Sequence, residues 1–362
     1  MESERPVRLV AVGDVIPTRP LVEDDALPGR VVGALGHLRA ADVAFGTLET
    51  ALTDRGQPWE KVVSYRSDPS IADAVEAMGF DIVSLANNQT MNFGAPGLLQ
   101  TIELLEARGI RHVGAGRTED EAWAPVVVET CGQRIAFVAL TCVAPIGWAA
   151  VGAHPGLAAL RVRTAYEVDA RWEQEEPGIA PRVRTWLEDV DLDRARGAVE
   201  AAARAADMVV ASVHWGVGAS RTPSDYQRQL SNVLVAAGAA VVLGGHPPPL
   251  QGLEVDDSSL VAYSMGTFVR QQPRPVALRA VYEAMPSAGL LVALDVHREG
   301  RLGIDVLPME LGDDDLSALA TPARAETIIQ DVLSRSDGAR IGVGSDAGRL
   351  RFDLARKNLH TR

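Results

Sequence analysis

Cysteine is scarce in this chain, which contains only Cys131 and Cys142 among 362 residues. Two thiols are too few for a disulfide framework or for a metal site built from thiolates. Both cysteines lie in or beside apolar runs. We therefore interpret them as reduced thiols of the protein core.

The chain also lacks long apolar runs and an excess of basic residues. Its start, "MESERPVRLVAVGD", passes from charged residues directly into a short strand pattern, without the apolar core of about 7–15 residues that a signal peptide has. No apolar run approaches the roughly 18 residues of a membrane span. The formal charge of −13 opposes binding to nucleic acid or to anionic membranes. We expect a cytoplasmic protein without nucleic-acid or membrane partners, acting on a small-molecule or peptidic substrate.

Short β-rich runs alternate with helical patterns along most of the chain, which is typical of α/β proteins. The runs "PVVVET" and "RIAFVALT", joined by Cys131-Gly132-Gln133, predict an antiparallel pair and hence sheets of mixed direction. Strands are further predicted at 7–12, 43–46, 80–86, 207–216, 239–247, 259–268 and 288–296. Helices are predicted near 30–40, 70–78, 94–107, 193–205, 223–237 and 322–334.

The connecting segments are too short to mark a domain boundary, so residues 1–362 are predicted to form a single domain. At 47% apolar residues, the composition suits one well-packed core. The segment of about 143–190 breaks the alternation and is rich in Pro, Gly, Trp and charge. Because long irregular segments in compact domains tend to be functional, we interpret it as an inserted loop or lid.

Five predicted strands end in polar side chains, namely Asp14, Glu49, Asn88 with its neighbour Asn87, His214 and His246. Taken singly, each has an ordinary structural explanation, such as a turn or a helix cap. Because ligands bind at the carboxyl ends of strands in open α/β sheets, their joint occurrence favours one common site. Carboxylate, amide and imidazole together suit Mn²⁺, Fe²⁺ or Zn²⁺, which would activate water or a substrate oxygen.

The order of the motifs resembles the CapA family, named for poly-γ-glutamate capsule biosynthesis. The matching runs are "GDVIPTR", "FGTLET", "SLANNQTMNFG", "VASVHWG", "GGHPPPLQG" and "AYSMGTF", and the likeness extends from about residue 7 to 340. The resemblance implies the calcineurin-like metallophosphatase superfamily and a four-layer α/β/β/α sandwich with mixed sheets. It also implies metal or active-site roles for Asp14, Glu49, Asn88, His214 and His246.

This chain departs from the family's motifs at several polar positions. Where the family reads ANNH, this chain has Gln89, which cannot transfer a proton near neutral pH as histidine does. Gly218 stands where HWGxE has its carboxylate, and the GHHPH run retains only His246. The resemblance implies a two-metal site, whereas the residues present predict one divalent ion, or none.

Three functions remain open at this stage. The first is metal-assisted hydrolysis or transfer at an amide, peptidic or glutamyl-like, or at a phosphate ester, in a biosynthetic or catabolic pathway. The second is a repurposed scaffold with metal-independent catalysis or ligand binding, and the third is an oxygen-activating non-haem iron enzyme. The catalytic candidates are Glu49, Asn87, Gln89 and His214.

Substrate-binding candidates come from two places in the sequence. Tyr65 and Arg66 stand at the family's substrate-side position, and Arg66 offers a bidentate partner for a carboxylate or phosphate. In the middle insertion, His154, Arg161 and Arg163 are candidates for the mouth of the site, and Trp148 or Trp172 for its cap. Substrate identity and oligomeric state are left open.

Overall fold

Two β-sheets of mixed direction stack face to face in the computed structural model, which describes residues 5–21, 27, 29–274, 280, 284–336 and 348–355. The first sheet has the order β18 (Ser317–Leu319), β17 (Arg301–Leu311), β16 (Ala288–Val296), β1 (Val7–Ile16), β2 (Val43–Leu48), β3 (Ile82–Ser84) and β4 (Arg111–Val113), with β15 (Thr267–Arg270) beside β1 and β19 (Leu350–Ala355) beside β17. The second has the order β13 (Leu253–Val255), β14 (Leu260–Ala262), β12 (Val241–Gly245), β11 (Met208–His214), β7 (Gln133–Thr141) and β6 (Val126–Thr130).

Both sheets contain a parallel centre with antiparallel strands at the side. Strands β1 to β4 run parallel, whereas β16 and β17 are antiparallel to their neighbours. In the second sheet β7, β11, β12 and β14 are parallel, and β6 forms the predicted antiparallel hairpin with β7 through Cys131 and Gly132, both at positive φ. Both cysteines are free, as predicted.

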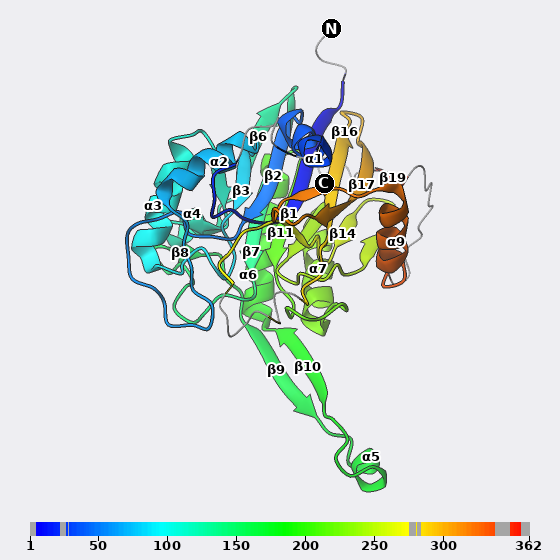
Figure 1. Ribbon diagram of the computed structural model, residues 1–362. Helices are drawn as coiled ribbons and strands as arrows, with labels where there is room; N and C mark the ends of the chain where they lie inside the picture. The colour runs from blue at the N-terminus through cyan, green and yellow to red at the C-terminus, as the bar shows by residue number, and fades with distance from the viewer. Residues whose placement is uncertain are drawn as a thin grey trace.

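Helices cover the outer face of each sheet (Figure 1). On the first sheet these are α1 (Gly29–Arg39), α2 (Ala72–Ala77), which continues the short helical turn Pro69–Ile71, and α3 (Gly94–Glu106), and on the second they are α6 (Asp189–Ala205) and α7 (Asp225–Ala237). The remaining short elements are β5 (Ala115–Gly116), α4 (Glu119–Trp123) and β8 (Gly156–Leu157) at one side and α9 (Pro322–Leu333) beside β17. This confirms the predicted four-layer α/β/β/α sandwich.

The alternating side chains of β1 show why the strands are buried on both faces. Leu9 and Ala11 point into the core between the sheets, and Val10 and Val12 point to the helices. Across the inter-sheet core, Phe45 stacks on Phe137 with ring centroids 5.4 Å apart. Since successive residues of a strand face opposite sides, a strand covered on both sides reads as a nearly continuous apolar run.

The prediction of one strand over 259–268 is wrong. The structure divides it into β14, which belongs to the second sheet, and β15, which belongs to the first. Gly266 adopts a φ of 66°, and the Ser264 hydroxyl accepts its N–H at 3.2 Å and donates to Pro247 O at 2.7 Å. The chain therefore turns between the two sheets at this point, a change of direction that an apolar run does not reveal.

The middle segment contains a two-stranded antiparallel hairpin that projects from the body of the molecule. It consists of β9 (Val162–Glu167) and β10 (Arg182–Leu187), with α5 (Ala170–Glu175) at the far end (Figure 1). Whether residues 1–362 form a single domain with this segment as a lid stays a prediction. Within the described ranges, no helix is both long and apolar enough to cross a membrane.

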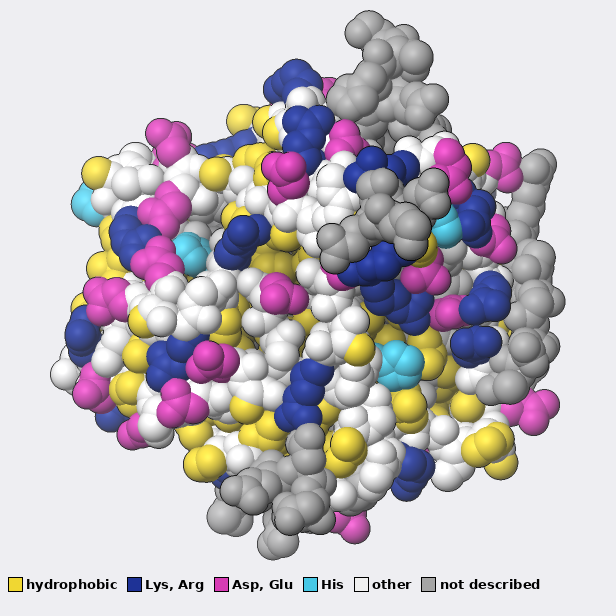
Figure 2. Space-filling view, turned by 90° about the horizontal axis from the view of Figure 1, so that it is seen from above, with side chains coloured by type: hydrophobic (Ala, Val, Ile, Leu, Met, Phe, Trp, Pro, Cys, Tyr) yellow, Lys and Arg dark blue, Asp and Glu magenta, His cyan; other side chains and the backbone are white. Residues whose placement is uncertain are grey.

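Charged side chains of both signs are interspersed on the end of the molecule opposite this hairpin (Figure 2). Although the chain has a net charge of −13, the acidic side chains on that face do not form one continuous acidic patch.

Candidate active site

Five polar side chains from both sheets meet at the carboxyl ends of parallel strands. They lie in or soon after β1, β2, β3, β11 and β12, and they are Asp14, Glu49, Asn88, His214 and His246. Because the two sheets face each other, these strand ends reach the same edge of the sandwich. The structure thus brings together all five predicted metal-site residues, while their roles stay predictions.

Two glycines allow the strand ends to approach this closely. A Cβ atom on Gly13 would lie 2.0 Å from the carbonyl oxygen of Gly266, and one on Gly245 would lie 2.7 Å from Asp14 Oδ1. After Gly245 the chain places His246 at a φ of 88°, and its backbone N–H donates to Asp14 Oδ2 at 3.0 Å. This hydrogen bond joins the first sheet to the second directly at the site.

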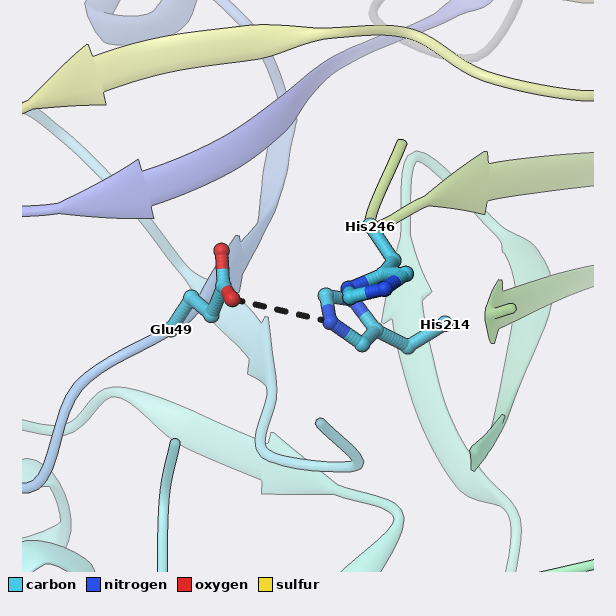
Figure 3. A group of neighbouring side chains, drawn as sticks. All are labelled: Glu49, His214 and His246. Carbon is cyan, nitrogen blue, oxygen red and sulfur yellow. Dashed lines mark ion pairs between the residues drawn. The ribbon is translucent and has the colours of Figure 1, made fainter. Parts of the chain in front are cut away.

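His214 lies at the centre of the cluster and uses its two ring nitrogens differently. Its Nε2 is 3.0 Å from Asn88 Oδ1 and 3.7 Å from Glu49 Oε1. Its Nδ1 is 3.6 Å from Asp14 Oδ1 on the other side of the ring. Figure 3 shows Glu49 pointing at the His214 ring, with the His246 ring alongside; the two imidazole centroids are 5.0 Å apart.

Burial favours the uncharged form of each ionisable group in the cluster. It raises the pKa of Asp14 to about 7, against the opposing effect of the His246 N–H, and with the charge of Asp14 it raises the pKa of Glu49 well above 4.5. Burial also lowers the pKa of His214 well below 6.5 and that of His246 to about 4. The imidazoles are thus in their metal-binding form, whereas ion binding must displace protons from the carboxyl groups.

The residues present fit one divalent ion. Ligand atoms of Glu49, His214 and His246 all lie within 4.8 Å of one another, and a carboxylate with two imidazoles suits Mn²⁺, Fe²⁺ or Zn²⁺. Asp14 Oδ1 and His214 Nδ1 are buried without a hydrogen-bond partner among the described residues. An ion on the Nε2 side of His214 would leave the ring proton on Nδ1, aimed at Asp14 Oδ1, and so would explain both atoms.

In that arrangement Asp14 orients His214 from behind, whereas the sequence predicted Asp14 as a ligand. Asn88 Oδ1 lies on the Nε2 side with Glu49 and is placed as a fourth donor. With an ion at that position, four of the five residues would face it and Asp14 would hold the central imidazole.

Asn87 and Gln89, which both follow β3, have different positions relative to the site. Asn87 is fully buried: its Nδ2 donates to Leu48 O, and its Oδ1 accepts from the backbone N–H groups of Gln89 and Thr90. This side chain shapes the turn and does not line the cavity beside the cluster. Gln89 does line it, and its Oε1 accepts from Asn92 Nδ2 at 2.9 Å. Of the two amide candidates for catalysis, only Gln89 reaches the site.

Lys61 also reaches the site, although it is not among the residues predicted from the sequence. Its Nζ donates to the backbone oxygen of Asn88 and to Gln89 Oε1, and lies 5.0 Å from the centroid of the Trp148 ring. Burial lowers the pKa of Lys61 to about 8, although the charge of Glu49 opposes this. Lys61 stands in an irregular segment without periodicity, but it is one of only two lysines among 35 basic residues, and this rarity was the available signal.

An open cavity of about 810 Å³ adjoins the cluster. Its wall is largely apolar, with Ile16, Val63, Pro248 and Met285 among its lining residues. Asp14, Glu49, Asn88, Gln89 and His246 all contribute to the same lining. The cavity therefore has room for an apolar group next to the candidate ligands.

Only one of the four predicted substrate-binding residues lines this cavity. Tyr65 does so, and its hydroxyl donates to the backbone oxygen of Glu49 at 2.9 Å. Arg66 is exposed and stacks on Phe93, His154 is exposed, and Arg161 forms an ion pair with Asp191 at 3.2 Å.

The other insertion candidates lie apart from the cavity as well. Arg163 forms an ion pair with Glu188 at 2.7 Å in the projecting hairpin, and Trp172 lies on α5 at its far end. Trp148 is fully buried and packs edge-on against Trp59. Trp148 thus supports Lys61 from within the core, and none of these three side chains lines the cavity.

Comparison with known proteins gives a consistent family result. Residues 8–272 match the family described as Bacterial capsule synthesis protein PGA_cap. An uncharacterized protein of Sinorhizobium fredii is 28% identical over 370 residues, which cover 89% of this chain and 78% of that protein. The PGA biosynthesis protein CapA of Bacillus subtilis is 25% identical over 326 residues, covering 87% and 73%. A probable polyglutamine synthesis accessory protein of Mycobacterium tuberculosis is 29% identical over 242 residues, covering 64% and 57%.

Proposed function

We propose that this chain, which belongs to the bacterial capsule synthesis protein family PGA_cap, is a metal-assisted hydrolase or transferase acting on an amide or a phosphate ester. One observation carries the proposal: Glu49, His214 and His246 offer ligand atoms within 4.8 Å of one another beside an open cavity. Such a convergence of buried ionisable groups beside a cavity is typical of active sites.

The ion would be held by Glu49, Asn88, His214 and His246. Asp14 would accept a hydrogen bond from the protonated Nδ1 of His214. A divalent ion at this position lowers the pKa of water and polarises a carbonyl or phosphoryl oxygen. Gln89, which lines the cavity, orients a substrate group by hydrogen bonding and transfers no proton. Lys61 Nζ donates hydrogen bonds to the backbone oxygen of Asn88 and to Gln89 Oε1, and so holds both residues in place.

The charges of the cluster favour one ion over two. Asp14 and Glu49, when ionised, carry two negative charges, which one divalent ion neutralises. A second ion would leave two positive charges uncompensated beside Lys61 in a poorly hydrated site. Pro248, where the family motif has a further imidazole, adds apolar surface at this side of the cavity.

An amide is the preferred substrate class. Among the relatives, the Mycobacterium tuberculosis protein is described by a role in polyglutamine synthesis, and polyglutamine is an amide-linked polymer. The apolar cavity wall suits such a peptidic or glutamyl-like chain better than a small, highly charged phosphate ester.

The first test is metal content, measured by elemental mass spectrometry on untagged protein purified without chelator. We expect about one equivalent of Mn, Fe or Zn per chain, as one site predicts, and its loss in His214→Ala. His154→Ala is the matched control, because His154 is exposed and does not line the cavity beside the cluster. Metal content unchanged in His214→Ala would contradict the assignment.

Activity is tested on the metal-loaded protein with glutamyl and peptidyl anilides and with an aryl phosphate. Turnover of an anilide, lost in His214→Ala and kept in His154→Ala, is the expected result. Turnover of the phosphate alone would make the ester the substrate class.

A second candidate function is metal-independent ligand binding on a repurposed scaffold. It is favoured by the raised pKa values of Asp14 and Glu49 and the lowered ones of His214 and His246, because uncharged groups can stay buried without an ion. Protein that is folded and metal-free, and that stays so after incubation with Mn²⁺ or Zn²⁺, would favour this function over metal-assisted catalysis.

A further inference from the structure

The hairpin of β9 and β10 with α5 at its end, here called the arm (residues 162–187), concentrates the exposed apolar surface of the molecule. Seven of the twelve large apolar side chains that the described part of the chain exposes lie between residues 166 and 190. On the arm itself, Tyr166 is 71% exposed, Val183 53% and Trp172 52%. Exposed apolar side chains gathered in this way mark an interaction surface.

Tyr166 and Val183 lie on one face of the arm, and this face continues the core of the body, whereas Trp186 lies on the opposite face, paired with Arg163. Directly opposite residues of an antiparallel pair share a face, and the register pairs Leu187 with Val162 and Val183 with Tyr166. Leu187 is buried in the core beneath the second sheet, with Val162 packed against it. The same face therefore leads outward from that core to the exposed pair at the outer end of the strands.

The inner end of the arm is tied to α7, but its outer end is not stabilised in the same way. Leu187 N–H donates to Gln229 Oε1 at 2.9 Å, and Tyr226 N–H donates to Thr185 Oγ1 at 3.4 Å. Beyond these contacts the arm continues as a two-stranded ribbon (Figure 1). An isolated two-stranded hairpin is at best marginally stable in water, so the outer part gains stability from a partner that covers its apolar face.

The charges of the arm are complementary to each other. The tip, residues 168–181, carries Asp169, Glu173, Glu175 and Glu176 against Arg171, a formal charge of −3. The two strands carry Arg163, Arg182 and Arg184 against Glu167, a formal charge of +2. When two identical arms lie antiparallel about a two-fold axis, the acidic tip of each meets the basic strands of the other.

We propose that the arm is a self-association surface, and that its partner is the arm of a second copy of this chain. Apolar contact between the Tyr166–Val183 faces and attraction between tips and strands act together. No described residue of the arm lines the cavity at the strand ends, so the contact between the two arms does not use the cavity wall.

The test is sedimentation equilibrium of the full chain from about 1 to 100 μM, a range that covers micromolar dissociation constants. We expect a dimer that weakens about tenfold or more in the double variant Tyr166→Ser/Val183→Thr, because both side chains lie at the centre of the contact. The matched control is Ile146→Ser/Val151→Thr, which removes two exposed apolar side chains outside the arm. The control should associate like the unaltered chain.

A charge exchange makes the test specific for arm against arm. Glu173→Lys/Glu175→Lys/Glu176→Lys makes the tip basic, and Arg182→Glu/Arg184→Glu makes the strands acidic. Each variant alone should be monomeric because tip and strands then repel, whereas a mixture of the two should form a heterodimer with both contacts complementary. A chain that stays monomeric throughout the concentration range overturns the proposal and leaves the arm for a different partner. So does a dimer that the arm variants leave unchanged.

Discussion

Replacing Asp14 by Asn should stabilise the metal-free protein at alkaline pH. Burial raises the Asp14 pKa from 3.8 to about 7, and a tenfold change in proton affinity corresponds to about 1.4 kcal/mol, so the buried charge costs at most about 4 kcal/mol. Asparagine carries no charge, and its amide can accept the His246 N–H and donate to His214 Nδ1. We expect the free energy of unfolding of Asp14→Asn to exceed that of the unaltered chain by up to about 4 kcal/mol. This is a large fraction of ordinary protein stability.

The sign of the pH dependence follows from linkage. A carboxyl group whose pKa is raised by folding stabilises the fold fully below pH 3.8, and this contribution is lost as the pH rises to about 7. The unfolding free energy of the unaltered chain, relative to Asp14→Asn, should therefore fall between about pH 4 and pH 7 and level off above. Urea unfolding of chelator-treated protein at about pH 4.5 and about pH 8 measures this difference.

Asp305→Asn is a control with the opposite expectation. Burial alone would raise the Asp305 pKa, but the hydrogen bond and charge of Arg351 and the charge of Arg349 hold it below 3.8. Its stabilisation is present above that pH and lost on acidification, so Asp305→Asn should be less stable than the unaltered chain at about pH 8. Equal stability of metal-free Asp14→Asn and the unaltered chain at alkaline pH would refute the reasoning for Asp14.

Three further predictions concern the same cluster. If Asp14 orients His214, Asp14→Asn should still bind the ion, with an affinity about 10–100-fold weaker, as for other partners of metal-bound histidines. His214→Ala should lose the ion. Equilibrium dialysis distinguishes these two outcomes. Lys61→Met should weaken ion binding and turnover, because Asn88 and Gln89 lose their common donor, and Lys61→Arg, which keeps the charge but not the point geometry, should restore part of both in the same dialysis and turnover assays. Gln89→His should change turnover more than substrate affinity in steady-state kinetics; unchanged kinetics would make Gln89 a residue of the turn only.

The fold was predictable where one-dimensional patterns suffice. The runs around β1, β11 and β16 are apolar on both faces because helices cover the outside and the second sheet covers the inside. The division of 259–268 between the sheets was not predictable in this way, since it depends on a turn at Gly266 rather than on hydropathy. The arm was missed because its strands are largely exposed on both faces and place charged residues among the apolar ones, so that no buried face marks them.

The site was predictable to the extent that strand ends determine it. Asp14 and His214 lie in the last residues of buried strands, and Glu49 and His246 directly follow such strands, so sheet geometry alone brings them together. Lys61 and Asn87 were misjudged for opposite reasons. Lys61 reaches the site by its long side chain from an irregular segment, whereas Asn87 stands at the right strand end but turns inward to cap the loop. Side-chain direction in a turn depends on hydrogen bonds that no spacing rule supplies.

The protonation states of the cluster allow the protein to fold without the ion, whereas metal-assisted catalysis needs the ion. Without an ion, burial favours protonated carboxyl groups and neutral imidazoles, so the cluster is largely neutral below the Asp14 pKa of about 7. With one divalent ion and both carboxylates ionised, it is neutral again. Because neither state buries a net charge below about pH 7, we expect the sandwich to fold before the ion binds, unlike small domains that need metal to fold. Loss of the ion should therefore abolish metal-assisted catalysis while leaving the fold, and for that reason metal content and unfolding must be measured as independent quantities.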